Sequence, residues 1–251
     1  MSNERESNLR WQESVHALGE RSHYKKVWNR QAQDVEVAKL AVGGFTSEET
    51  LDVTARETIS FLETTVGIQP MDIILEIGCG VGRVGKVLSQ QCYHWFGCDI
   101  SGEMLKHAAR RLNGISNVSL VELHTVGLSE IHNETIDLAY CTVVFMHLLE
   151  WDRFKYVQEM HRILRPGGRC YFDNVPLDTE HGWRVFSESA EYPIARRAAH
   201  MSMTSSREEF RTYLERAGFE DIRTHELSNG MIAGTGRKAR INPTGELIQT
   251  V

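Results

Sequence analysis

The stretch Leu75–Gly85, LEIGCGVGRVG, decides the fold, because four glycines follow a short apolar run within it. It holds two overlapping glycine patterns. The pattern G-x-G-x-x-G at residues 80–85 has the spacing that cradles the pyrophosphate of a dinucleotide. The pattern G-x-G-x-G at residues 78–82, preceded by Glu76, instead suits a loop that holds a small charged group of the amino-acid type. Either pattern predicts a strand, a tight turn and a helix, with a ligand at the turn.

The charge of Glu76 favours the second pattern. A carboxylate that faces the ligand there would repel a diphosphate and would attract an ammonium or sulfonium group. The alternative is that Glu76 points into the helix layer and pairs with Arg83 or Lys86. Asp99, fourteen residues after Gly85, can accept both ribose hydroxyls of an adenosine, so it supports an adenosine ligand of either kind. On this interpretation Gly85 is explained by close packing of a helix on a strand.

Short apolar runs alternate with amphipathic segments from this stretch onward, which predicts an α/β fold with helices on both faces of a mainly parallel sheet. The pair Asn229-Gly230 between two strand-like runs predicts a terminal antiparallel hairpin. The expected helix caps are Thr46 or Ser47 and, later, Ser205 or Ser206, and another helix is expected to start at Ser101. The expected strands are 72–78, 93–99, 118–123, 136–144, 169–175, 220–227 and 231–238, and the expected helices between them are 82–91, 101–112, 152–164 and 205–218.

Two flanking segments are expected to cover one end of this sheet as lids. Residues 1–49 read as helical over 7–41 and end before the capping-box sequence TSEET. Residues 176–204 are polar, aromatic and irregular, and this segment is longer than a simple crossover connection requires. The expected organisation is an N-terminal helical lid, then a core over 50–240 that contains 176–204 as a substrate-lid insertion, and a disordered tail over 241–251.

The composition restricts the class of protein. The 251-residue chain has a formal charge of −6 and no block of lysine and arginine, which disfavours DNA as a partner. Its apolar runs are too short to span a bilayer, and the first ten residues lack the apolar core of a secretory signal. Five cysteines without a CxxC pair suit reduced thiols, so a cytoplasmic location is expected. The histidines show no metal-binding spacing.

Four segments, in order, resemble the class I S-adenosylmethionine-dependent methyltransferases. They are ILEIGCGVGRVGKVL (74–88), GCDISGEML (97–105), IDLAYCTVVFMHL (136–148) and LRPGGRCYFD (164–173). The resemblance extends from about Thr50 to Lys238. It implies a Rossmann-like sheet of seven strands with a reversed seventh strand. It also implies S-adenosylmethionine as the cofactor and S-adenosylhomocysteine as its product.

Carried over by position, the resemblance implies a cofactor site along the ends of the first strands. The glycine loop would hold the methionine end, Asp99 the ribose, and Ile100 and Met104 the adenine. His124 stands where family members often have an acidic residue near the adenine amino group, which is the clearest departure. The implied cofactor residues are Glu76, Gly78, Cys79, Gly80, Gly82, Asp99, Ile100, Met104, His124, Thr125, Val126 and Thr142.

His147, just after the fourth strand, is the leading candidate for a general base that takes a proton from the methyl acceptor. Alternatively, His147 caps the next helix or packs in the turn. His181 and His200 in the insertion are the alternates. The expected acceptor contacts are Tyr24, Trp28, His147, Asn174 and Arg196.

Asp173-Asn174 resembles the metal-binding pair of Mg²⁺-dependent O-methyltransferases, but the further carboxylate expected after the fourth strand is missing. The Asn/Asp-Pro-Pro-aromatic sequence of amino-methylating DNA enzymes is missing there too. We therefore expect a metal-independent methyltransferase that acts on a hydroxyl, carboxyl or amine of a small molecule. A protein or peptide terminus is the alternative acceptor. An NAD-dependent oxidoreductase and a non-catalytic cofactor-binding protein are the alternatives from other classes.

Overall fold

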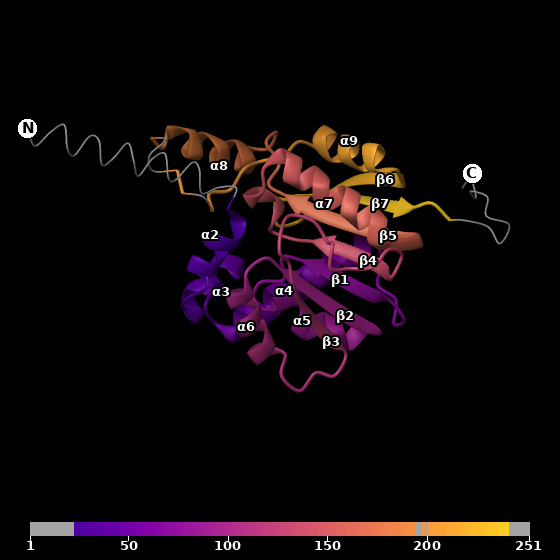
Figure 1. Ribbon diagram of the computed structural model, residues 1–251. Coiled ribbons are helices and arrows are strands. Elements are labelled where there is room, and N and C mark those ends of the chain that lie inside the picture. Colours follow the sequence, from indigo (N-terminus) through magenta and orange to yellow (C-terminus); the bar gives the residue numbers. More distant parts are fainter. Residues whose placement is uncertain (1–22, 194–196, 199, 241–251) are drawn as a thin grey trace, which may run out of the picture.

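A computed structural model describes residues 23–193, 197–198 and 200–240 of the chain (Figure 1). One sheet of seven strands has the order β3-β2-β1-β4-β5-β7-β6. β7 is antiparallel to both of its neighbours, and the other pairings are parallel. The expected Rossmann-like sheet with its terminal hairpin is therefore confirmed. The strands are β1 (Ile73–Ile77), β2 (His94–Asp99), β3 (Val118–Glu122), β4 (Ile136–Cys141), β5 (Leu164–Asn174), β6 (Phe219–Glu226) and β7 (Ile232–Lys238).

Helices cover both faces of the sheet, and each face has its own apolar core. Leu62, Leu88 and Ala108 belong to the core under α4, α5 and α6, whereas Met160 and Phe210 belong to the core under α7 and α9. The helices are α2 (Tyr24–Gln31), α3 (Val35–Gly43), α4 (Glu48–Thr65), α5 (Arg83–Leu88), α6 (Gly102–Arg111), α7 (Glu150–Ile163), α8 (Glu180–Glu191) and α9 (Arg207–Ala217), with short 3-10 helices η1 (Ser89–Gln91) and η2 (Phe145–His147).

The expected caps Ser47 and Ser206 are confirmed, and the helix expected to start at Ser101 has Ser101 as its cap. The Ser47 hydroxyl accepts from the Thr50 amide at the start of α4, and the Ser101 hydroxyl accepts from the Met104 amide at the start of α6. Ser206 forms a full capping box at the start of α9. Gly85 also has the expected role, because a Cβ on it would lie 2.5 Å from the Trp95 ring of β2.

The described part of the N-terminal segment is divided where continuous helix was expected. The Asp34 side chain accepts from the amides of Glu36 and Val37, so it caps a new helix, α3, after α2 has ended. Residues 1–22 of this segment lie outside the described residues. Within the described ranges, every helix is too short or too polar to span a bilayer.

The insertion also differs from expectation, because it contains the twelve-residue helix α8 where irregular chain was expected. The Thr179 hydroxyl caps this helix by accepting from the Gly182 amide at 3.1 Å. Figure 1 shows α8 toward the same end of the sheet as α2 and α3. The tail 241–251 lies outside the described residues.

Candidate functional site

The loop between β1 and α5 has a backbone that glycine adopts readily. Gly78, Gly80 and Gly82 have φ angles of 71°, 53° and 74°, in the left-handed region. The Gly78 amide donates to the Cys98 carbonyl of β2 at 2.8 Å and ties the turn to the sheet. A Cβ on Gly80 would lie 2.5 Å from Val42 Cγ1, so α3 packs directly on the glycine loop.

Asp99 ends β2 and turns its carboxylate toward this loop. Its Oδ2 accepts from the Gly80 amide and its Oδ1 from the Ser101 amide, each at 2.8 Å. Burial raises the pKa of the Asp99 carboxyl to about 6, although the hydrogen bonds from these backbone amides oppose the rise. Each carboxylate oxygen keeps a second lone pair, so Asp99 can still accept from hydroxyls of a ligand.

A cavity lies over the carboxyl ends of β1, β2 and β4. Its wall combines α2, the end of α3, the glycine loop, the end of β2 and the turn after β4. Of the predicted residues, Tyr24, Trp28, Gly78, Gly80, Asp99, Ile100, Met104, Thr142 and His147 line it. Val143, next to Thr142, also lines it, and the lining residues that were not predicted are Ala41, Val42, Ile77, Leu123, Val144, Leu148 and Tyr156. Since these are mainly apolar, their local sequence does not distinguish them from ordinary core residues.

Glu76 does not have the expected ligand-facing position. Its side chain is 3% exposed and does not line the cavity. The Tyr140 hydroxyl donates to Glu76 Oε2 at 2.5 Å, on the side of the sheet that packs under α4 and α5. Burial raises the pKa of the Glu76 carboxyl to about 8, against the lowering effects of the Tyr140 hydrogen bond and the Arg83 charge. The alternative placement in the helix layer is closer to the structure, so the argument from a charged, ligand-facing Glu76 fails.

The turn after β4 has a strained residue beside the cavity. Val143 has a φ of 59°, which is unusual for a β-branched residue. Asp173 holds it there: its Oδ1 accepts from the Val143 amide at 2.7 Å, and its Oδ2 accepts from the hydroxyls of Thr142 and Tyr171 at 2.7 and 3.1 Å. Burial raises the pKa of Asp173 to about 6. Both carboxylate oxygens therefore serve the internal structure of this turn.

His147 and α2 meet at the cavity. The imidazole contacts the Trp28 ring edge-on, with ring centroids 4.9 Å apart and 65° between the planes. The Tyr24 hydroxyl donates to Asp152 Oδ2 at 2.5 Å and accepts from the Leu149 amide at 3.0 Å. The helix α2 therefore contributes two aromatic side chains to the cavity wall and is attached to the start of α7.

Several predicted residues lie away from this cavity. The segment that begins at His124 lines a neighbouring depression instead, and the His124 amide donates to Glu130 Oε1 at 3.1 Å. Asn174 is fully buried and donates from its amide to the Ser205 hydroxyl at 2.8 Å, so it is not placed for the predicted acceptor contact. Arg196 lies outside the described residues. The predicted residues that do not line the cavity are Glu76, Cys79, Gly82, His124, Thr125, Val126 and Asn174.

Comparison with known proteins agrees with this geometry. Residues 74–168 match the family described as "Methyltransferase domain". An uncharacterized methyltransferase of Geobacillus kaustophilus is 26% identical over 130 residues, which cover 51% of this chain and 58% of the relative. A ubiquinone/menaquinone biosynthesis C-methyltransferase of Haemophilus ducreyi is 26% identical over 174 residues, which cover 61% and 62%. An 18S rRNA (guanine(1575)-N(7))-methyltransferase of Saccharomyces cerevisiae is 42% identical over 64 residues, which cover 25% and 23%.

A solved structure shows the same fold. It is a chain of the complex between the Haloferax volcanii Trm112 methyltransferase activator and a methyltransferase, with a TM-score of 0.64 and 16% identity, covering 84% of this chain and 96% of that chain. This chain spans 58% and 62% of the length of the first two curated relatives. The match makes residues 74–168 a methyltransferase domain, and the order of the motifs and the reversed β7 agree with the class I S-adenosylmethionine-dependent methyltransferase superfamily.

Proposed function

We propose that the chain transfers the methyl group of S-adenosylmethionine to a hydroxyl, carboxyl or amine of a small molecule. The observation that carries this proposal is the composition of one cavity wall. The glycine loop and Asp99 share that wall with His147 and with Tyr24 and Trp28 of α2. A concave, largely apolar site with a few polar groups suits a small ligand.

The residues of the cavity fit the cofactor. Gly80 places no side chain between the loop and α3, Asp99 offers acceptors for ribose hydroxyls, and Ile100 and Met104 offer apolar surface for an adenine. The bound cofactor supplies an electrophilic methyl group on a sulfonium. The contribution of the protein is to exclude water and to orient the acceptor, which is what the aromatic residues of α2 are placed to do.

The proposed reaction needs no metal ion. The supporting observation is Asp173, whose two oxygens already accept from Thr142, Val143 and Tyr171 and are engaged in holding the turn after β4. His147 reaches the same cavity and can take a proton from a hydroxyl or a protonated amine. A protein or peptide terminus is the alternative acceptor.

Calorimetry with S-adenosylhomocysteine and with NADH tests the cofactor assignment. We expect the first to bind and the second not to bind, and no detectable binding of S-adenosylhomocysteine would overturn the proposal. A screen with methyl-labelled S-adenosylmethionine against pools of small molecules and of peptides, with and without EDTA, tests the acceptor. Labelling of peptides alone would replace the small-molecule acceptor, and complete loss of labelling in EDTA would refute metal independence.

Replacing His147 by Gln tests the general base. For a hydroxyl acceptor we expect turnover to fall about 10²–10⁴-fold, because a positioned base contributes that much. Glutamine keeps a polar side chain beside Trp28 but cannot take the proton. His132→Gln is the control, because His132 is exposed and lines none of the cavities described here. Unchanged turnover in His147→Gln would show that orientation of the acceptor is sufficient.

A further inference from the structure

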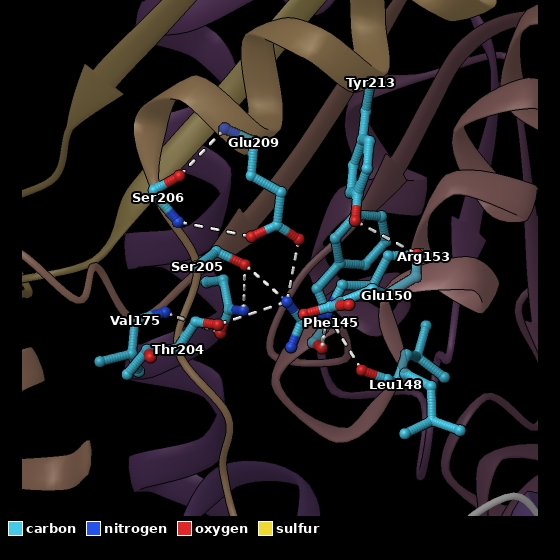
Figure 2. A network of polar contacts seen from close by, with 12 residues as sticks. Phe145, Leu148, Glu150, Arg153, Val175, Thr204, Ser205, Ser206, Glu209 and Tyr213 are labelled. Carbon is cyan, nitrogen blue, oxygen red and sulfur yellow. Dashed lines mark hydrogen bonds and ion pairs between the residues drawn. The ribbon is translucent and has the colours of Figure 1, made fainter. Parts of the chain in front are cut away.

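Arg153 is buried where α7, α9 and the end of the inserted segment meet (Figure 2). The residue lies in the first part of α7 and is 2% exposed. It also lines a second cavity, together with Leu177, Phe186 and Met201 of the inserted segment. An arginine this deeply buried is costly unless its donors are used, so its partners indicate its role.

Two of its partners are the carbonyls on either side of His147. The Nε of Arg153 donates to the Phe145 carbonyl at 2.9 Å and to the Leu148 carbonyl at 3.0 Å. A guanidinium is planar and directs its donors along fixed lines, so this one side chain fixes both ends of the turn. The His147 ring that contacts Trp28 belongs to this turn.

The other partners lie at the end of the inserted segment and on α9, as Figure 2 shows. The Nη1 of Arg153 donates to the Thr204 carbonyl at 3.3 Å, to the Ser205 hydroxyl at 2.9 Å and to Glu209 Oε1 at 3.0 Å. The second oxygen of Glu209 accepts from the Ser206 amide in the capping box of α9. Glu209 thus joins the arginine to the start of α9.

The inserted segment and the turn also contact each other directly. The Met203 amide donates to the Met146 carbonyl at 2.8 Å. At the end of β5, Asn174 donates to the same Ser205 hydroxyl that Arg153 holds. The turn, the end of β5 and the end of the inserted segment therefore form one hydrogen-bonded unit with Arg153 at its centre.

We propose that Arg153 is a positioning residue that couples the inserted segment to the His147 turn. The inference rests on the proposed function, in which the His147 turn forms part of the methyl-transfer site. Without the guanidinium, the two turn carbonyls and the Glu209 carboxylate would each lose the hydrogen bond from Arg153. The His147 turn, which lines the first cavity, and the end of the inserted segment, which lines the second, would then no longer be held in a fixed relative position.

Hydrogen exchange measured by mass spectrometry tests this coupling in Arg153→Met and Arg153→Lys. Because hydrogen bonds to charged groups are strong, we expect exchange at least about tenfold faster over residues 145–149 and 201–206 in both variants. Arg162→Met is the matched control, because Arg162 lies on the same helix and also donates to two loop carbonyls, those of Leu128 and Ile131. The control should leave both segments unchanged. The lysine variant keeps a positive charge opposite Glu209, so it tests the inference even where the methionine variant does not fold.

A second measurement reports on His147 itself. Its ring resonances in NMR, identified with His147→Gln, are expected to shift in Arg153→Lys because the ring moves relative to Trp28, and to stay in place in Arg162→Met. Unchanged exchange in both segments of Arg153→Lys would overturn the inference. Calorimetry with S-adenosylhomocysteine on the wild-type protein separates the two proposals. An absence of binding overturns the proposed function, whereas binding combined with unchanged exchange overturns only the role of Arg153.

Discussion

Replacing Asp99 by Asn is expected to weaken the binding of S-adenosylhomocysteine about a hundredfold or more. A charge-assisted hydrogen bond contributes about 1.5–3 kcal/mol, and the carboxylate is placed to accept more than one from the ribose. The amide also directs an N–H group at the backbone amide of either Gly80 or Ser101, both of which now donate to Asp99. The loop should therefore lose its anchor together with the ligand contact. Isothermal titration calorimetry measures the change in affinity.

Asp137→Asn is the matched control for this variant. Asp137 also accepts from a backbone amide, that of Ile73 at 2.8 Å, and pairs with Arg165, but it lies at the opposite end of the strands. We expect this control to lower the free energy of unfolding and to leave the affinity for S-adenosylhomocysteine unchanged. An equal loss of affinity in both variants would mean that Asp99 acts only through general stability.

The raised pKa of Asp99 gives the same prediction a pH dependence. Burial raises that pKa to about 6, so the carboxylate is ionised above this pH and protonated below it. Only the ionised form offers acceptors to both backbone amides and to a ligand. The affinity of the wild-type protein should therefore fall as the pH decreases through about 6, and the fall should be smaller in Asp99→Asn, in which Asp173, whose pKa is also about 6, still titrates beside the cavity. The free amino-acid end of the ligand does not titrate in this range, because its α-carboxyl group ionises at much lower pH and its α-amino group at much higher pH.

The predicted site residues that line the cavity lie there because of the local path of the chain. Gly78 and Gly80 follow β1 directly, and Asp99 ends β2. In an open α/β sheet the carboxyl ends of adjacent parallel strands meet at one edge. These residues therefore lie close together once β1 and β2 pair, independently of how the other segments pack. Their convergence at the cavity needed no long-range information.

Glu76 shows what the same motif leaves open. Side chains alternate along a strand, and Leu75 and Ile77 pack in the core under α7. Glu76 therefore points to the other face, where its partner Tyr140 stands opposite it in the register of β1 and β4. The alternation was visible in the sequence. Which face of β1 borders the ligand site depends, however, on the packing of α2 and α3, which are distant from β1 in the sequence.

The helix α8 was missed for a related reason. Its large apolar residues Trp183 and Phe186 are 57% and 44% exposed, and Gly182 is its buried residue. Trp183 and Phe186 stack on each other one turn apart, so α8 does have helically spaced apolar residues, but they face solvent instead of a core. Likewise, the partners of Arg153 come from segments up to 56 residues away, so no local pattern indicates them.

Gly80→Ala is expected to lower both the thermal stability and the affinity for S-adenosylhomocysteine, whereas Gly114→Ala should lower stability alone. The two glycines have φ angles of 53° and 86°, so alanine costs about 1–2 kcal/mol at each position. At Gly80 the new Cβ would also meet Val42 Cγ1 at 2.5 Å, whereas nothing lies within 4 Å at Gly114. Such overpacking adds about 1–3 kcal/mol, which places the Tm of Gly80→Ala below that of the control and moves the cavity wall. Equal melting temperatures and equal affinities would contradict this account.

The double variant Val42→Ala/Gly80→Ala identifies the cause of that difference. Val42→Ala removes the γ-carbons that the new methyl group would meet, so the two substitutions should be non-additive by about 1–2 kcal/mol in favour of the double variant. Strict additivity would show that Val42 does not limit the space at Gly80. The affinity should stay below that of the wild type, because the added methyl group remains in the cavity wall. Since Val42 belongs to α3, recovery of stability without recovery of affinity would separate the packing of α3 on the glycine loop from the contact of that loop with the ligand.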